Sequence, residues 1–212
     1  MEKIKYNLDE LLSFEQRYRT TFINSLSGYK TPVLIGTWDN EGNPNLAIFN
    51  SLIHVGANPP LVGFIVRPDS ADRHTLQNIL ETKVFTINHI TEDFYQQAHQ
   101  TSARYGKEQN EFKEVGLTEE YKTDFFAPFV KESPIQIGVD FVQKIDIEIN
   151  GTIMIIGKIK NISIPKESIS KDGFINLFKL KSVVSQGLDS YHHVKPIARL
   201  AYAKPNKNVT EI

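Results

Sequence analysis

Residues that could bind an anion are grouped at one place in this sequence, where an apolar run gives way to an amphipathic segment. Arg67 ends the apolar run, and the next helix is expected to begin around Arg73, His74 and Thr75. A helix N-terminus presents unpaired backbone N–H groups and the positive end of a dipole, which suits a phosphate. The pattern therefore predicts a phosphate-bearing cofactor held over the end of a β-sheet. An ordinary helix start, with Asp72 as its cap and a solvated Arg73, is the alternative interpretation.

Other reactive groups are scarce in the sequence. It contains no cysteine, which excludes disulfides, thiol catalysis and Cys-ligated iron–sulfur or zinc sites. Besides His74, the sequence has five histidines, and none is followed by a second histidine in a His-x-x-x-His pattern: His54, His89, His99, His192 and His193. We therefore expect no metal site.

The composition is that of a globular protein. Of 212 residues, 40% are hydrophobic and 23% are charged, and the formal net charge is −1. The near-neutral balance provides no general field for nucleic acid or for an anionic membrane, and we expect neither as a partner. With no linker, repeat or low-complexity tract, the chain is expected to form a single domain over residues 1–212. The N-terminus shows no export signal and no run is long enough to span a membrane, so a cytoplasmic location is expected.

Short strands dominate the first half of the sequence. The apolar runs predict strands at Val33–Trp38, Asn45–Val55, Leu61–Val66 and Val84–Asn88. Apolar residues at helical spacing predict one or two helices in Leu8–Leu26 and another helix at Ser70–Glu81. The helix at Ser70–Glu81 would place the anion-binding residues on its first turn.

The second half predicts a long hairpin between less regular segments. Alternating apolar residues predict strands at Ile135–Ile149 and Thr152–Ile164, joined at the strong turn signal Asn150-Gly151. The remaining segments are expected to be helical over 92–106, irregular or partly helical over 107–131, and helical again near 176–184. Many strands with few helices indicate a mainly β protein with α additions, built as an antiparallel barrel. A Rossmann fold is excluded because no Gly-rich turn follows the first strand.

Several segments, taken in order, resemble the flavin reductase-like family. They are Pro44–Ser51, Asn58–Pro68, Arg73–Thr82, Val84–Asn88, Thr101–Tyr105, Glu111-Phe112, Gly116-Leu117, Glu132–Ile135 and Gly157–Ile159. The similarity covers roughly residues 20–165, which leaves 166–212 as a C-terminal extension. The resemblance implies an FMN-binding split β-barrel, an antiparallel Greek-key barrel with flanking helices.

The resemblance also implies a site and a reaction. The cofactor would be FMN, with FAD as the alternative, and NADH or NADPH would be the co-substrate of a homodimeric enzyme. Residues that match family positions would line the isoalloxazine ring (Phe49, Asn50 and Ser51), lie near it (Arg67), hold the 5′-phosphate (Arg73, His74 and Thr75) or surround the cofactor more loosely (Asn88, Ser102 and Ala103). No catalytic residue is assigned, since the flavin carries the hydride chemistry.

Three details qualify this site. His74 stands where many members have Asp, and Tyr29-Lys30-Thr31 stands where many have Pro-Arg-Pro. Asn50 and Ser51 interrupt an apolar strand, where polar groups cost free energy unless they are paired. They therefore favour a ligand at this point, with a polar bulge as the alternative.

Two functions follow from the resemblance. The first is an NAD(P)H-dependent flavin reductase that passes reduced flavin to a partner monooxygenase, or reduces a small acceptor itself. The second is a flavoredoxin-like electron carrier that receives electrons from a redox protein and has no NAD(P)H activity. A pyridoxamine-phosphate-oxidase-like protein, with a related barrel, is a third alternative.

Overall fold

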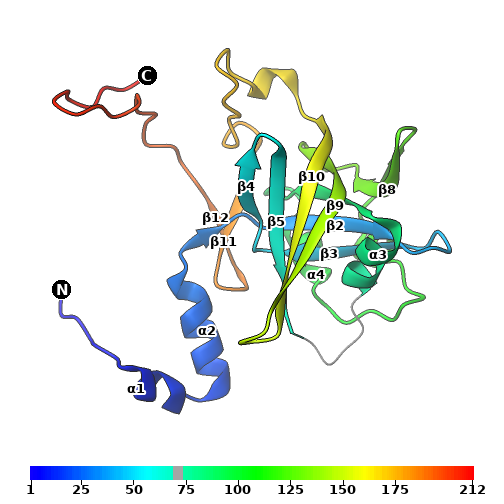
Figure 1. Ribbon diagram of the computed structural model, residues 1–212, viewed down its shortest axis with the longest axis horizontal. Coiled ribbons are helices and arrows are strands. Elements are labelled where there is room, and N and C mark those ends of the chain that lie inside the picture. The colour runs from blue at the N-terminus through cyan, green and yellow to red at the C-terminus, as the bar shows by residue number, and fades with distance from the viewer. Residues whose placement is uncertain (69–73) are drawn as a thin grey trace.

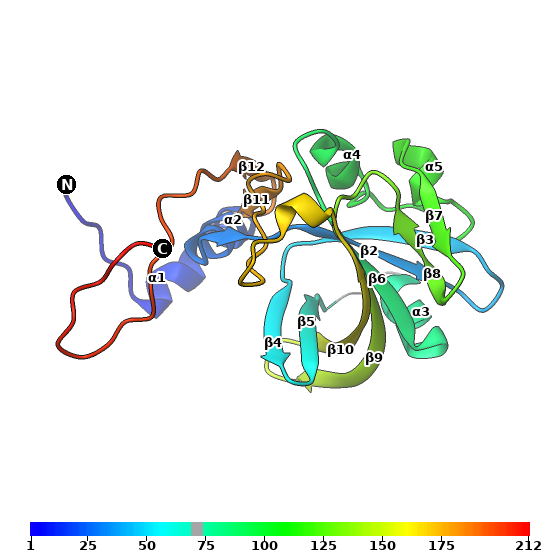
Figure 2. The same ribbon diagram turned by 90° about the horizontal axis from the view of Figure 1, so that it is seen from above.

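The computed structural model describes residues 1–68 and 74–212, and a seven-stranded antiparallel sheet forms its centre (Figure 1). The strands lie in the order β3-β2-β6-β9-β10-β5-β4, with every neighbouring pair antiparallel. Their bounds are β2 (Val33–Trp38), β3 (Pro44–Phe49), β4 (Ile53–Ala57), β5 (Pro60–Val66), β6 (Val84–His89), β9 (Gln136–Ile147) and β10 (Thr152–Ser163). Figure 2 shows the sheet curling so that β9, β10, β5 and β4 pass beneath β2. The predicted mainly β antiparallel barrel is confirmed.

The first half of β2, Val33–Ile35, is apolar without alternation because both faces of the strand are covered. Val33 and Ile35 point into the barrel, where they pack in one cluster with Phe64 and Phe85. Leu34 points the other way, into a second cluster outside the barrel. A strand buried on both faces has no solvent side that requires polar residues.

Short helices supply part of each cluster. Helix α3 (His74–Thr82) packs Leu76 and Ile79 into the barrel cluster. Helices α4 (Tyr95–Gln100) and α5 (Glu111–Val115) contribute to the outer cluster. The carboxylate of Glu111 accepts a hydrogen bond from the Leu46 backbone N–H at 3.1 Å, which fixes α5 against β3. Burial raises the pKa of this carboxyl above its ordinary value.

Two smaller sheets flank the barrel. One consists of β1 (Tyr29–Lys30), β11 (Val183–Gln186) and β12 (Ser190–His193), and the other of β7 (Glu119–Lys122) and β8 (Phe125–Val130). The N-terminal helices α1 (Leu8–Ser13) and α2 (Gln16–Leu26) and the C-terminal tail lie away from the barrel (Figure 1). A 3-10 helix at Lys166–Ser168 completes the elements. Among the described residues, no helix is both long and apolar enough to cross a membrane.

The predicted strand over Asn45–Val55 is wrong as a single element. The structure divides it into β3 and β4, with Asn50, Ser51 and Leu52 between them. The division occurs because the side chains of Asn50 and Ser51 hydrogen-bond to the backbones of other segments. The polar interruption in the sequence therefore marks a change of strand.

Three other predictions need correction. The helix expected near 176–184 is absent, because Val183 starts β11 and its N–H donates to Ile90 O. The helix predicted over 92–106 is shorter in the structure and consists of α4 alone. The backbone N–H groups that follow α4 bond to carbonyls only three residues earlier, as in tight turns. The region 107–131 contains α5, as partly expected, and also the unpredicted hairpin β7–β8. The start of the helix predicted at Ser70–Glu81 lies outside the described residues, which show it from His74 to Thr82.

Candidate functional site

A cavity of about 1070 Å³ lies between the barrel and the three-stranded sheet β1-β11-β12. Its walls come from the break between β3 and β4, the end of β5, the turn after α4, the end of α2 and the sheet itself. The volume slightly exceeds the usual range for small-molecule sites, roughly 300–1,000 Å³. A nucleotide-sized ligand therefore has room here.

One wall of the cavity is apolar. Phe49, Leu52, Ile65 and Val66 line it, and the Phe49 ring lies edge-on to the buried Phe64 ring with centroids 4.8 Å apart. The same packing fixes Phe49 against the barrel core, so this wall is rigid. A planar apolar ring system would find a matching surface on it.

Ser51 connects the β3–β4 break to β5. Its hydroxyl accepts from the Ile65 N–H at 2.9 Å and donates to the Ile65 C=O at 3.2 Å. Ser51 and Ile65 both line the cavity, so these two bonds hold together two parts of its wall. The polar side chain predicted to face a ligand thus has its hydrogen-bonding partners within the protein.

A Ser51→Ala variant should lose about 1–3 kcal/mol of folding stability, because both backbone groups of Ile65 lose their partner. Urea unfolding of the purified variant measures the loss. Ser102→Ala is the matched control, since Ser102 also lines the cavity but is exposed. Equal stability of the two variants would contradict a bridging role for Ser51.

Asn50 holds the β11–β12 hairpin over the barrel. Its side-chain amide donates to the C=O of Gly187 at 3.0 Å. Gly187 begins the hairpin turn with φ +63°, a conformation that glycine adopts without strain. Asn50 therefore positions the turn whose next residues, Leu188 and Asp189, line the cavity.

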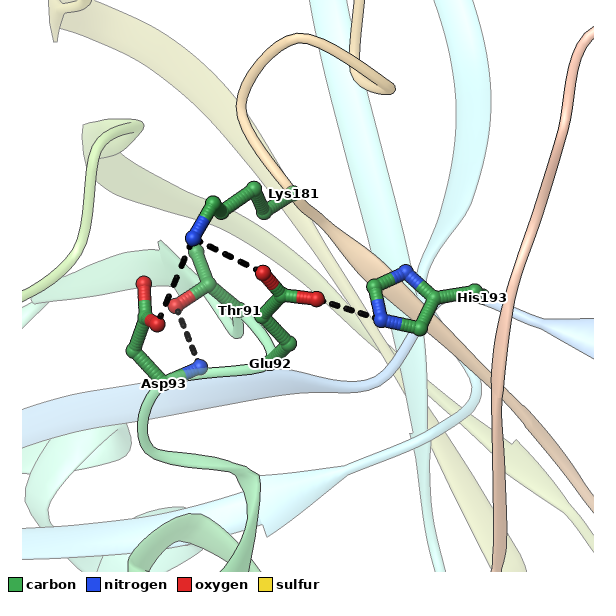
Figure 3. A network of polar contacts seen from close by, with 5 residues as sticks. All are labelled: Thr91, Glu92, Asp93, Lys181 and His193. Carbon is green, nitrogen blue, oxygen red and sulfur yellow. Dashed lines mark hydrogen bonds and ion pairs between the residues drawn. The ribbon is translucent and has the colours of Figure 1, made fainter.

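The outer side of the hairpin is held by an ionic network (Figure 3). Glu92, just after β6, contacts Nε2 of His193 on β12 and forms an ion pair, at 2.8 Å, with Lys181 just before β11. Lys181 also lies 3.6 Å from Asp93, whose N–H donates to Thr91 Oγ1. The pKa of Glu92 is below its usual value, chiefly because Lys181 donates to it. The hairpin is thus fixed to the barrel on two sides.

Two cations face the cavity. Lys30 on β1 is half-buried and donates to Asn24 O at 3.0 Å, and Arg67 follows β5. Burial, and to a smaller extent the charge of Arg67, lower the pKa of Lys30. The repulsion between two positive charges across a cavity is reduced when an anion binds between them.

A histidine–tyrosine pair stands on the same side as the hairpin. His99 Nδ1 lies 2.9 Å from the hydroxyl of Tyr191, and both residues line the cavity. Burial, followed by the nearby charge of Asp189, raises the pKa of Tyr191 to about 12. The phenol therefore stays protonated at neutral pH and can act as a hydrogen-bond donor.

The structure brings five of the predicted site residues to this cavity and places the others elsewhere. Phe49, Asn50, Ser51, Arg67 and Ser102 line it. The other five take no part in its described wall, or lie outside the described residues, and they are treated in turn below: Arg73, His74, Thr75, Asn88 and Ala103.

Arg73 lies outside the described residues, and His74 is the first residue of α3. Thr75 is buried, and its hydroxyl accepts from the Asn45 amide at 2.9 Å. Ala103 is exposed in the turn after α4. The assignment of these residues to a phosphate remains a prediction.

Asn88 is fully buried, and its side chain hydrogen-bonds to other parts of the protein core. Its amide donates to Leu34 O and Thr86 Oγ1, and its oxygen accepts from Val130 N–H. These bonds join β6 to β2 and β8. The side chain therefore has a structural role in the core.

Sequence reasoning missed the wall that the C-terminal segment supplies. Ser185, Leu188, Asp189 and Tyr191 all line the cavity. Their strands were predicted as helix or left unassigned, so no pattern connected them to the barrel.

Within the described ranges, no cluster of metal-ligating side chains is found.

Comparisons with known proteins agree with this fold. The model of the flavin reductase like domain matches residues 26–178. A crystal structure from Shewanella frigidimarina NCIMB 400, named as a candidate flavin reductase with a split barrel domain, is 47% identical, with a TM-score of 0.92 over 95% of this chain and 100% of that one. Nitrilotriacetate monooxygenase component B from Bacillus cereus is 19% identical, with a TM-score of 0.82 over 93% of this chain and 98% of that one, and shares the fold.

An uncharacterized protein of Aquifex aeolicus (strain VF5) is 31% identical over 103 residues, which are 48% of this chain. The match spans 53% of the length of that curated relative. The family model covers far more than half of the chain, and the fold is the split barrel seen in the solved structures. The chain therefore belongs to the flavin reductase-like family.

Proposed function

We propose that the protein is an FMN-binding oxidoreductase of the flavin reductase type, which takes hydride from NADH or NADPH. The observation that carries the proposal is the cavity beside the β3–β4 break. Phe49, Asn50 and Ser51, the residues that the family resemblance assigns to the isoalloxazine ring, lie together on its wall. Membership of the family supports a flavin as the ligand.

The residues present fit a flavin nucleotide. The apolar wall formed by Phe49, Leu52 and Ile65 suits the ring, and its rigidity limits the entropy lost on binding. The cations Lys30 and Arg67 suit negative charge in the same cavity. The volume of about 1070 Å³ also leaves room for a second molecule beside the flavin.

A bound flavin supplies the two-electron chemistry, and the protein's residues have binding and positioning roles. Phe49 and Leu52 exclude water from one side of the cavity. Asn50 holds the turn of the β11–β12 hairpin against the cavity, and Ser51 fixes the wall to β5. Orientation of two reactants against each other is the main contribution that such a site makes to hydride transfer.

The acceptor of the electrons is proposed to be a partner monooxygenase that uses reduced flavin, or a small molecule bound in the same cavity. The fold shared with a protein named monooxygenase component B supports the first. We also propose a homodimer, because α1 and α2 bury none of their own residues while Tyr18, Ile23 and Leu26 are exposed. Light scattering should then give twice the chain mass of 24.1 kDa.

Anaerobic titration of the purified protein with NADH and with NADPH tests the reaction, after mass spectrometry identifies any co-purified flavin. The expected result is a protein-bound FMN whose visible absorbance is bleached by one nicotinamide faster than free FMN is under the same conditions. Bound FAD would correct the cofactor. Bound flavin that neither nicotinamide bleaches would favour the flavoredoxin-like carrier, and failure to bind any flavin would reject the proposal.

A further inference from the structure

Three hydrogen-bond donors form a row across the sheet that covers the cavity. Lys30 on β1 is paired with Ser185 on β11, and Ser185 is paired with Tyr191 on β12. Residues directly opposite in antiparallel strands share one face of the sheet, with neighbouring Cβ atoms about 5 Å apart. All three residues line the cavity, so the shared face is the one turned toward the barrel.

The middle residue of the row has an unsatisfied hydroxyl. Ser185 is 2% exposed, and its Oγ has no hydrogen-bond partner among the described residues. Buried hydroxyl groups in folded proteins are nearly always paired, so an orphan on a cavity wall indicates a missing ligand. The hydroxyl can donate to any acceptor that enters beside Lys30.

The charge around the row is positive at one end. Within the described ranges neither Lys30 nor Arg67 forms an ion pair with a carboxylate, although both line the cavity. Asp189, the single carboxylate in the described wall, lies in the β11–β12 turn, and its charge acts on Tyr191, so the negative charge belongs to the Tyr191 end of the row and not to the Lys30 end. A neutral ligand would leave the two cations uncompensated, whereas an oxyanion would pair with them.

Tyr191 adds a neutral donor at the far end of the row. His99 Nδ1 and the Tyr191 hydroxyl are 2.9 Å apart. When His99 Nδ1 carries the ring proton, it donates a hydrogen bond to the phenol oxygen of Tyr191. The phenol hydrogen is then free to be donated to a ligand. The row then presents an ammonium, a serine hydroxyl and a phenol to one ligand.

We propose that Lys30, Ser185 and Tyr191 bind the oxyanion, carboxylate or phosphate, of the second molecule that meets the flavin in this cavity. The inference rests on the proposed function for the presence of the flavin, but the donors and their arrangement do not depend on it. The oxyanion has two sources, namely the carboxylate of a small acceptor or a phosphate of the nicotinamide dinucleotide. The flavin's own phosphate is predicted at Arg73, His74 and Thr75, and of these His74 and Thr75 are not among the residues that line this cavity.

Isothermal titration calorimetry with matched probes tests the site on both apo and FMN-loaded protein. Benzoate is compared with benzyl alcohol, and AMP with adenosine. At least one anion should bind wild-type protein, and more tightly than its neutral partner. Lys30→Met should weaken that anion about ten-fold or more, and Ser185→Ala should weaken it about three-fold, while both leave the neutral probe unchanged. Lys158→Met, an exposed strand lysine outside the cavity, is the matched control and should change nothing.

The outcomes separate the alternatives. Selective binding of benzoate identifies a carboxylate acceptor, and selective binding of AMP identifies the dinucleotide phosphate. Absence of anion binding to the wild type, or equal losses for anion and neutral probe, overturns the site.

A ten-fold loss of FMN affinity in Lys30→Met, with riboflavin unaffected, would instead assign Lys30 to the flavin phosphate and also overturn the proposed anion site. Failure of flavin binding alone would reject the proposed function and leave anion binding to apo protein intact. Ser185→Ala, the smaller change, keeps the test available if Lys30→Met does not fold.

Discussion

A Gly36→Ala variant is expected to lose more than about 3 kcal/mol of folding stability. Gly36 lies in the middle of β2, opposite Thr86 on β6. A Cβ atom added there would overlap the Pro128 backbone oxygen and would lie 2.6 Å from Thr86 Oγ1. Those two atoms are themselves joined by a buried 2.6 Å hydrogen bond, so neither can move without breaking it. Overpacking of this kind, against backbone, costs more than the usual crowding between flexible side chains.

Gly56→Ala provides the matched control for this prediction. Gly56 is also a strand glycine, but an added Cβ atom would come no closer than 3.5 Å to Pro59 O, an ordinary contact. Its stability should change by less than about 1 kcal/mol. Urea unfolding of both variants measures the difference. Similar stabilities for the two would show that β8 does not pack against β2 as the structure has it.

An Arg73→Ala variant is expected to bind FMN about ten- to a hundred-fold more weakly than wild type. The prediction rests on the sequence, because Arg73 lies outside the described residues. A charge-assisted hydrogen bond to phosphate contributes roughly 1.5–3 kcal/mol, and the variant would remove it. Fluorescence titration of apo protein with FMN measures the change.

Riboflavin, which lacks the phosphate, is the matched ligand, and its affinity should hardly differ between the variant and the wild type. Arg17→Ala, an exposed arginine on α2, should bind both flavins as wild type does. Equal losses for FMN and riboflavin in Arg73→Ala would assign Arg73 a structural role. Unchanged FMN binding would remove the predicted phosphate anchor.

The sequence predicted the barrel well because its strands have strong local signals. Strand β2 was predicted with its observed bounds, and the Asn150-Gly151 turn joins β9 to β10 as expected, with Gly151 at φ +69°. Such signals depend on a few adjacent residues. The strand at Asn45–Val55 was predicted too long because the cause of its break, hydrogen bonds to Ile65 and Gly187, lies far away in the sequence.

The candidate site was predicted only in part for the same reason. Phe49, Asn50 and Ser51 were found through a resemblance that covers their own segment. Lys30, Ser185 and Tyr191 come from three strands, and only the register of the small sheet aligns them. Register between β1 and β11 depends on tertiary contacts and has no local signature. The part of the cavity wall that these three strands form could therefore be found only from the structure.

A crystal structure of the protein saturated with FMN tests the central claim most directly. The predicted result is density for the isoalloxazine ring in the cavity, against Phe49, Asn50 and Ser51 and beneath the β11–β12 hairpin, with the phosphate toward the start of α3. An empty cavity in crystals grown with saturating FMN, or a ring bound elsewhere on the protein, would contradict the account.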